Sequence, residues 1–299
     1  MAAKMDAASG GGSRARGMGK LPREGVDLVY HSHGSGAPIL LLAGGPGLDP
    51  RYLEPLAERL GAGQRVVLLH QRGTGESRSS RIERSTLSLE ILVEDIELLR
   101  EHLGFDRWVL LGHSWGGILA MAYAGAHPQR VRGLVLVGSG GIASGWVGPY
   151  TDNVLSRLTA DERRAAAFWV EPERFRRDPQ RALVEYTRVV APAMVFEREA
   201  ALPLIERTLG DGAFNVAVNR ALATALPRYD FRAPLAQLSA PALVIQGRQD
   251  PVGESTARQI AQALPRSTLR FVERCGHWPF VERAAEFDAA LAEFLAGLG

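Results

Sequence analysis

The sequence predicts an α/β protein in which helices cover both faces of a mostly parallel β-sheet. Short apolar runs alternate with helix-like segments in both halves of the chain, as in buried parallel strands joined by helices. Between them, residues 141–228 show no strand-like alternation and are expected to form an inserted helical lid. A chain of 299 residues, 46% of them hydrophobic, is long enough to form one large core plus such a lid.

The expected elements of the first half follow one another in a regular order. Alternation of apolar and polar residues predicts a half-buried edge strand first, and continuous apolar runs predict two buried strands after it. Two segments with helical spacing complete this half. In chain order, the strand, strand, helix, strand and helix cover residues 25–33, 38–42, 52–60, 65–69 and 88–103.

The centre of the chain, Trp108–Gly117, reads WVLLGHSWGG. A short apolar run precedes Gly-His-Ser-Trp-Gly, and the small and apolar residues that follow suit a helix. A G-x-S-x-G turn between a strand and a helix is a nucleophile elbow, which exposes the serine hydroxyl and points a helix N-terminus at the group under attack. We therefore predict that Ser114 is a nucleophile.

Alternation of strands and helices resumes after the lid. The elements expected after it are strands at 242–246 and 268–273 and helices at 255–264 and 284–298, whereas a strand at 131–138 is expected before it. Residues 21–140 and 229–299 would thus form the core. Residues 1–20 are rich in glycine and basic residues without an apolar stretch, so we interpret them as a disordered tail and not a secretory signal.

A serine nucleophile needs a base, and the base needs an acid that orients it. Asp250 and His277 each follow a predicted strand, where open parallel sheets build their sites. The order Ser, Asp, His is the one expected for a nucleophile elbow. We predict the triad Ser114, Asp250 and His277. Alternatively, Asp250 caps the following helix, with Asp230 as the rival acid, or His277 is structural.

Attack on a carbonyl also needs donors for the oxyanion. We expect these to be the backbone N–H groups of Trp115 and Gly45, unless the loop at 43–47 is only a tight turn. The Trp115 side chain is expected to form a wall of the acyl pocket. Gly44, His113 and Trp278 are further candidates for substrate contact. Of the remaining histidines, we expect His70 to support a loop and four to be surface or capping residues: His31, His33, His102 and His127.

Several function classes are disfavoured. A net charge of +2 argues against a surface for nucleic acid or anionic lipid, and no apolar run is long enough to span a bilayer. The single cysteine, Cys275, reads as a small buried residue and favours a cytoplasmic protein. Residues 138–143 match G-x-G-x-x-A, but a loop follows where a dinucleotide site needs a helix. No P-loop and no Cys/His zinc spacing is present, so we expect no cofactor or metal.

Three motifs resemble the prolyl aminopeptidase (proline iminopeptidase) branch of the α/β-hydrolase superfamily: GGPG at 44–47, QRGTGES at 71–77 and GHSWGG at 112–117. The resemblance implies a cofactor-free serine hydrolase. Members that cleave an N-terminal residue hold its amine with lid carboxylates. Glu197, which follows Phe196, loosely matches one such position, with Glu171 and Glu185 as fallbacks. The stretch 214–219 carries no second carboxylate, and Ala43 stands where the family usually has histidine.

Together these features predict a serine hydrolase that acts through an acyl-enzyme. Its substrate would be a small ester, an amide or a short peptide, with the prolyl aminopeptidase and small-ester activities both open. The same triad could also serve a carbon–carbon bond hydrolase, a lactonase, a perhydrolase or an acyltransferase. A non-catalytic binding protein on the same fold is a further alternative. The sequence leaves the choice between monomer and homo-oligomer open.

Overall fold

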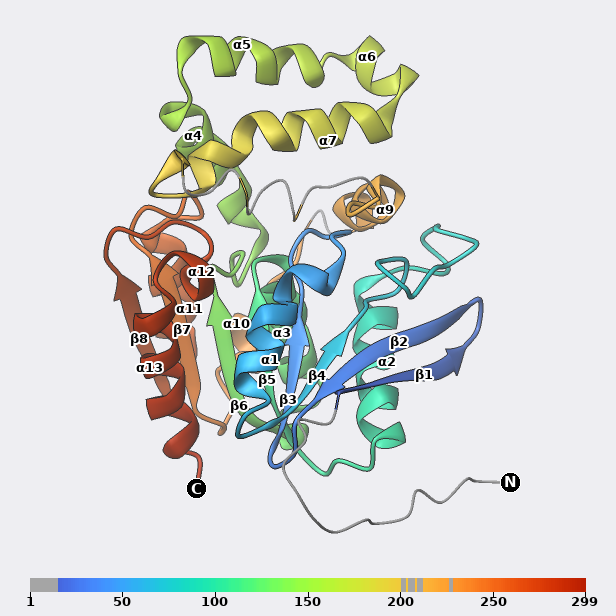
Figure 1. Ribbon diagram of the computed structural model, residues 1–299, viewed down its shortest axis with the longest axis vertical. Helices are drawn as coiled ribbons and strands as arrows, with labels where there is room; N and C mark the ends of the chain where they lie inside the picture. Colours follow the sequence, from blue (N-terminus) through green and yellow to red (C-terminus); the bar gives the residue numbers. More distant parts are fainter. Residues whose placement is uncertain (1–15, 200–202, 204–207, 209–211, 226–227) are drawn as a thin grey trace.

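The computed structural model describes residues 16–199, 203, 208, 212–225 and 228–299 of the chain (Figure 1). An eight-stranded sheet in the order β1-β2-β4-β3-β5-β6-β7-β8 forms its centre. β1 and β2 are antiparallel to their neighbours, and the other strands are parallel to one another. The strands are β1 Arg16–Arg23, β2 Val26–His33, β3 Pro38–Leu42, β4 Arg65–Leu69, β5 Trp108–His113, β6 Val131–Val137, β7 Ala242–Gly247 and β8 Ser267–Val272.

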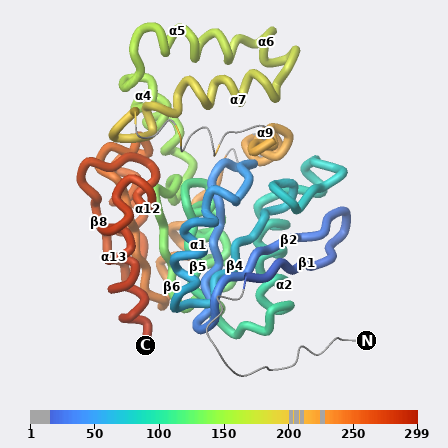
Figure 2. Tube along the Cα trace, in the orientation of Figure 1, coloured from blue at the N-terminus to red at the C-terminus, as the bar shows by residue number. Residues whose placement is uncertain are grey.

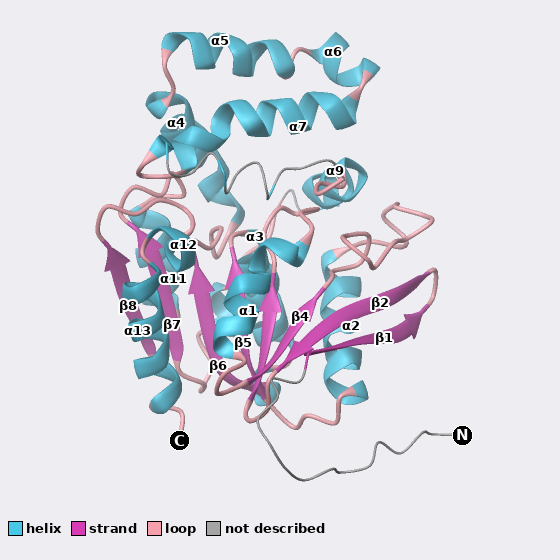
Figure 3. Cartoon of the chain, viewed as in Figure 1, coloured by secondary structure: helices cyan, strands magenta, loops and turns pink. Residues whose placement is uncertain are grey.

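Helices cover both faces of this sheet, as Figure 3 shows. The two faces carry separate apolar clusters because alternate residues of each buried strand point to opposite sides. Two helices, α1 Glu54–Leu60 and α13 Ala284–Ala296, cover one face. The other face is covered by α2 Leu89–His102, α3 Trp115–Ala126, α10 Arg232–Leu235 and α11 Glu254–Ala263.

The segment at residues 141–228, which we call the helical insertion, lies over the carboxyl ends of the parallel strands (Figure 1). Its described residues contain no strand longer than an isolated bridge. In the tube of Figure 2, α9 lies beneath α7, above the loops that follow β3 and β4. The insertion helices are α4 Val147–Arg157, α5 Ala160–Trp169, α6 Pro172–Arg177, α7 Pro179–Val190 and α9 Val216–Ala225.

The expected fold class is confirmed, and most strands begin and end within about a residue of their predicted limits. Two expectations at the N-terminal end are wrong. Residues 16–20, expected in the tail, belong to β1, whose side chains are mostly exposed and so give no apolar pattern. β2, expected at the edge, lies between β1 and β4. Residues 1–15 of the expected tail lie outside the described residues. Within the described part, no helix is long and apolar enough to span a bilayer.

Candidate active site

Ser114 lies at the sharp turn between β5 and α3. Its backbone has φ 57° and ψ −117°, a left-handed conformation that is uncommon outside glycine and is typical of a nucleophile elbow. The neighbouring glycines are required by close backbone packing. A Cβ on Gly116 would lie 2.1 Å from Leu42 O, and one on Gly112 would lie 2.2 Å from Gly116 O. Both contacts are too short for any side chain.

The structure brings Asp250 and His277 together at the ends of β7 and β8. His277 Nδ1 lies 2.9 Å from Asp250 Oδ2, and both side chains are buried. Because a carboxylate only accepts, the proton of His277 is on Nδ1 and its Nε2 is left as a base. Val252 N–H donates to Asp250 Oδ1 at 2.9 Å, which orients the carboxylate.

Gly138, the residue after β6, leaves the space that this pair occupies. Its φ is +49°, and a Cβ there would lie 3.0 Å from Asp250 Oδ2 and 3.1 Å from His277 Nδ1. The glycine that we considered as the start of a dinucleotide motif therefore adjoins the Asp–His pair.

Ser114, His277 and Gly45 line one cavity of about 190 Å³ between the sheet and the helical insertion. The Ser114 hydroxyl makes no hydrogen bond within the described part of the chain. Gly45 N–H and Trp115 N–H also have no acceptor among the described residues, so both are free to receive an oxyanion. A Cβ on Gly44 would lie 3.1 Å from Ser114 Cβ, which places this loop against Ser114.

The side chain of Trp115 does not form the expected wall of the pocket. It is buried in the core beneath α3, where its Nε1–H donates to Gln71 Oε1 at 3.0 Å. Gln71 in turn donates from Nε2 to Ala43 O at 2.9 Å. The indole therefore anchors the loop that carries Gly45 through Gln71.

The buried His113 and the half-buried Tyr52 form a second support. Gly44 N–H donates to the Tyr52 hydroxyl at 2.7 Å, and this hydroxyl lies 2.7 Å from His113 Nδ1. His113 Nε2 lies 2.9 Å from His277 O, which can only accept. The His113 proton is therefore on Nε2, and Tyr52 donates to Nδ1. Burial, reinforced by the neighbouring His277, lowers the pKa of His113 well below its usual value and keeps the ring neutral.

Tyr52 is a residue that sequence reasoning missed, because no motif marks it. His113 was expected to contact substrate, but it lies behind the cavity and is absent from the described lining. Trp278, the other aromatic candidate, does line the cavity.

The cavity is mainly apolar and aromatic. Trp278 Nε1 and Thr208 Oγ1 are buried there without a partner among the described residues, so both can hydrogen-bond a ligand. Most of the remaining lining comes from the helical insertion and was not predicted: Tyr150, Leu183, Tyr186, Thr187, Val190, Ala191, Met194, Phe214 and Asn219, with Leu48 from the core.

The three glutamates considered for amine binding lie elsewhere. Glu197 is half exposed and lies 3.7 Å from the guanidinium groups of Arg274 and Arg283. Glu171 and Glu185 form ion pairs within their own helical turns. None of the three is among the described residues that line the cavity.

Comparison with known proteins places these features in context. The family model described as "alpha/beta hydrolase fold" matches residues 37–284. A proline iminopeptidase from Lactobacillus helveticus is 27% identical over 291 residues, covering 93% of this chain and 97% of the relative.

Solved structures share the fold at lower identity. A thermophilic esterase from Thermogutta terrifontis superposes with a TM-score of 0.73 at 24% identity, covering 96% of this chain and 99% of the other. The proline iminopeptidase of Mycobacterium smegmatis gives 0.69 at 20% identity, covering 94% and 98%. The relative found by sequence is thus a proline iminopeptidase. The structures that share the fold include an esterase as well as a proline iminopeptidase.

Proposed function

The chain belongs to the α/β-hydrolase fold family, and we propose that it is a serine hydrolase that cleaves carboxylic esters through an acyl-enzyme. The observation that carries this proposal is the meeting of three loops at one cavity. Ser114 and His277 face the same space, Asp250 holds His277 Nδ1, and the free N–H of Gly45 lines the wall. The helical insertion would act as the lid of this site.

The reaction follows from these positions. Ser114 Oγ attacks the ester carbonyl carbon while its proton passes to His277 Nε2. The developing oxyanion accepts hydrogen bonds from Gly45 N–H and Trp115 N–H. The tetrahedral intermediate then breaks its bond to the alkoxy oxygen, which takes the proton from His277. Water attacks the acyl-enzyme in the same way and releases the acid.

The cavity favours an uncharged acyl group. Its described walls are mainly aromatic, aliphatic and hydroxyl side chains, with Asn219, Met194 and His277 beside them and no carboxylate among the described residues. Moving an ammonium group from water into such walls is costly without a paired charge. Trp278 Nε1 and Thr208 Oγ1 would instead bind a neutral polar atom of the substrate.

Prolyl aminopeptidase activity is the second candidate, because the relative from Lactobacillus helveticus is a proline iminopeptidase that matches nearly the whole chain. This activity would need a group that holds a free amine. The position of Glu197 beside two arginines argues against that role for this residue. Cleavage of lactones or carbon–carbon bonds, perhydrolysis and acyl transfer would use the same three residues.

A substrate panel with Ser114→Ala tests the proposal. We expect p-nitrophenyl butyrate to be hydrolysed much faster than proline p-nitroanilide. Ser114→Ala should lower this turnover by at least roughly 10³-fold, as for other serine triads, without lowering the unfolding midpoint. Ser139→Ala is the matched control, since Ser139 is a buried neighbour that does not line the cavity.

Full activity in Ser114→Ala would reject the mechanism, whereas faster cleavage of the anilide would select the aminopeptidase. Failure of a fluorophosphonate to label Ser114 would favour a binding protein.

A further inference from the structure

Helix α4 of the helical insertion lies against the loop that carries Asp250. Two of its side chains, Asn153 and Arg157, donate hydrogen bonds to the backbone carbonyl groups on either side of this aspartate. We propose that Asn153 and Arg157 are positioning residues of the hydrolase, which hold the acid of the triad in place for His277. This role rests on the proposed function, in which Asp250 is the acid that orients the base.

The two contacts enclose Asp250 in the sequence. Asn153 Nδ2 donates to Pro251 O at 3.0 Å, and Arg157 Nη1 donates to Gln249 O. Positions 153 and 157 are about one helical turn apart, so both side chains lie on the same face of α4. Among the described residues, no other donor serves either carbonyl. A single helix of the insertion therefore supplies the donors that this loop lacks.

Each of these carbonyls belongs to a peptide group whose N–H also holds the loop. Pro251 O shares its peptide group with Val252 N–H, which donates to Asp250 Oδ1 at 2.9 Å. Gln249 O shares its peptide group with Asp250 N–H, which donates to Gly247 O at 3.1 Å. Because a peptide group is planar, a donor that fixes its oxygen also fixes the direction of its N–H. The two side chains of α4 thereby orient both the carboxylate and the backbone of Asp250.

Arg157 also reaches the turn that holds His277. The same Nη1 donates to Ala193 O at 3.3 Å, and Met194 O, one residue further on, accepts from His277 N–H at 2.7 Å. The guanidinium group therefore lies between the loop of Asp250 and the turn that supports His277. Burial lowers the pKa of Arg157 from its ordinary value, and the negative charge of Asp250 opposes this shift. Since arginine stays protonated in proteins, its charge adds an attraction to Asp250.

The rest of this face of α4 is also engaged. Val154, which lies between the two polar residues in the sequence, is buried in the same apolar cluster as Ile245 of β7. Tyr150, one turn earlier, lines the cavity. The helix is thus docked by packing as well as by hydrogen bonds, so we expect it to remain in place when one polar side chain is lost.

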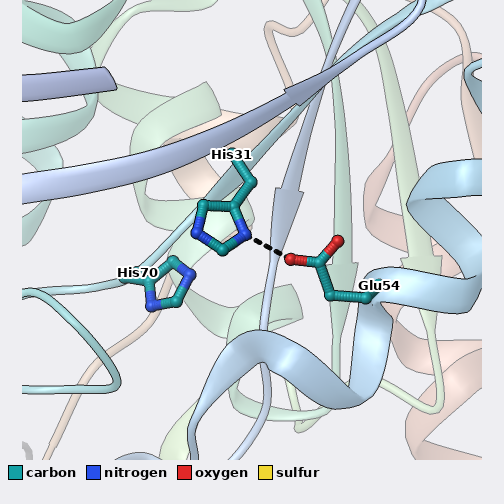
Figure 4. A group of neighbouring side chains, drawn as sticks. All are labelled: His31, Glu54 and His70. Atoms are coloured by element: carbon teal, nitrogen blue, oxygen red, sulfur yellow. Dashed lines mark hydrogen bonds and ion pairs between the residues drawn. The ribbon is translucent and has the colours of Figure 1, made fainter. Parts of the chain in front are cut away.

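A different polar group, around His31, does not reach the cavity. His31 and His33 were expected on the surface, but both are buried, because β1 covers β2 and β2 is not an edge strand. Figure 4 shows His31 facing the Glu54 carboxylate, with the His70 ring beside them. Arg16 Nη2 lies 3.7 Å from the other oxygen of Glu54. Glu54 thus joins β1 and β2 to α1, and none of these residues is among the described lining of the cavity.

Simple adhesion of the insertion to the core is the rival explanation for the contacts of α4. An adhesive contact contributes to stability and, through the wall at Tyr150, to KM. A positioning contact changes the hydrogen bond between Asp250 and His277 and therefore kcat. The two explanations can be separated by kinetics and by a direct signal from this hydrogen bond.

The kinetic test uses the full chain and p-nitrophenyl butyrate. Arg157→Gln and Asn153→Ala should each lower kcat about tenfold and change KM by less than about twofold, because neither residue lines the cavity. Arg157→Lys should keep most of kcat, since both carbonyls accept from one nitrogen that an ammonium group can replace. Arg163→Gln is the matched control. Its guanidinium donates only to Leu155 O and Leu158 O, both within the insertion, so kcat should not change.

Proton NMR supplies a second readout that needs no substrate. The His277 Nδ1 proton, donated to Asp250, should resonate far downfield of other ring protons and disappear in His277→Gln. Arg157→Gln and Asn153→Ala should shift or broaden this resonance, whereas Arg163→Gln should leave it unchanged. Loss of a purely adhesive contact would not move it.

The outcomes separate the two proposals. A wild-type chain that gives the resonance but does not cleave the ester would reject the hydrolase, and the resonance would still test the positioning role. Wild-type kcat and an unmoved resonance in both Arg157→Gln and Asn153→Ala would overturn the positioning role alone, as would an equal loss of kcat in Arg163→Gln. A wild-type chain with neither turnover nor resonance would overturn both. Should Arg157→Gln fail to fold, Asn153→Ala, which removes one hydrogen bond and no charge, decides the question.

Discussion

At the scale of single residues, a series of hydrogen bonds through Tyr52 and His113 links the two sides of the candidate site. One end holds Gly44, beside the proposed oxyanion donor Gly45, and the other end holds the backbone oxygen of His277. Each proton in this series of hydrogen bonds has one assignable position. Loss of the Tyr52 hydroxyl therefore affects both the Gly44 end and the His277 end. The Tyr52 hydroxyl is therefore a positioning group and not a catalytic one.

Tyr52→Phe should disturb both supports without touching the cavity. Gly44 N–H and His113 Nδ1 would lose their partner, at a cost of about 1–3 kcal/mol in unfolding free energy. We expect kcat for the ester to fall roughly tenfold or more while KM changes little, because small displacements of catalytic groups are costly. Steady-state kinetics and chemical denaturation provide the measurements.

Tyr123→Phe is the matched control for this change. Tyr123 also loses a buried hydroxyl, which donates to Glu97 at 2.6 Å, but it lies on α3 away from the cavity. It should lose stability and keep kcat. Equal effects of the two variants on kcat would show that Tyr52 has no special link to the site.

From the sequence, the position of a residue in the fold can be predicted where a local pattern marks the end of a strand. Ser114, Asp250 and His277 each follow a strand, and the structure places all three at the same end of the sheet. Tyr52 could not be found in this way, because its role depends on a ring 61 positions further along the chain. The expected amine-binding role of Glu197 depended on family position alone, and its side chain meets arginines.

At the scale of elements, the loop that carries His277 is held by the helix that follows it. Glu282, at the end of α12 (Pro279–Glu282), accepts hydrogen bonds from Gly276 N–H and Trp278 N–H, on either side of His277. It also accepts one from Phe196 N–H in the helical insertion at 2.8 Å. His277 N–H itself donates to Met194 O at 2.7 Å. One carboxylate thus ties the loop of His277, the insertion and α12 together.

Glu282→Gln keeps the shape of the side chain and changes one acceptor into a donor. The new amide NH₂ group of the glutamine would face backbone N–H groups. The loop that carries His277 must then shift or leave a donor unpaired. We expect a stability loss of about 1–3 kcal/mol and a lower kcat for the ester, with a smaller effect on KM. Glu286→Gln, on the exposed side of α13, should change neither quantity. Wild-type kcat in Glu282→Gln would show that the loop is held without this carboxylate.

Element boundaries were predictable wherever burial produced a pattern. β3 and β4 were predicted to the residue because their apolar runs stop where the sheet stops. α2 begins after Ser88, whose hydroxyl accepts from Ile91 N–H, a capping signal visible in the sequence. β1 escaped prediction because its side chains are mostly exposed and so leave no apolar pattern.

At the scale of the whole molecule, the cavity depends on how the insertion folds over the sheet. Its walls come from α4, α7, the turn at Ala191–Met194, α9 and the segment before it, together with the core loops. These segments carry no motif, and their apolar residues show only that they are partly buried. The sequence could therefore predict which residues lie at the strand ends but not the shape of the space above them.

The burial of His113 also contributes to the loss of stability in acid. The folded protein keeps His113 neutral, since its pKa is well below 6.5, whereas the unfolded chain takes up a proton below about pH 6.5. The unfolded state then binds more protons, so stability is fully present above this pH and is lost as the pH falls. His113→Gln should reduce the slope of unfolding free energy between pH 6 and 5 by up to about 1.4 kcal/mol per pH unit. Denaturation measures this slope, and His102→Gln should leave it unchanged. An unaltered slope in His113→Gln would mean that His113 takes up a proton in the folded state as well. The hydrogen bonds from Tyr52 through His113 to His277 would then open in acid.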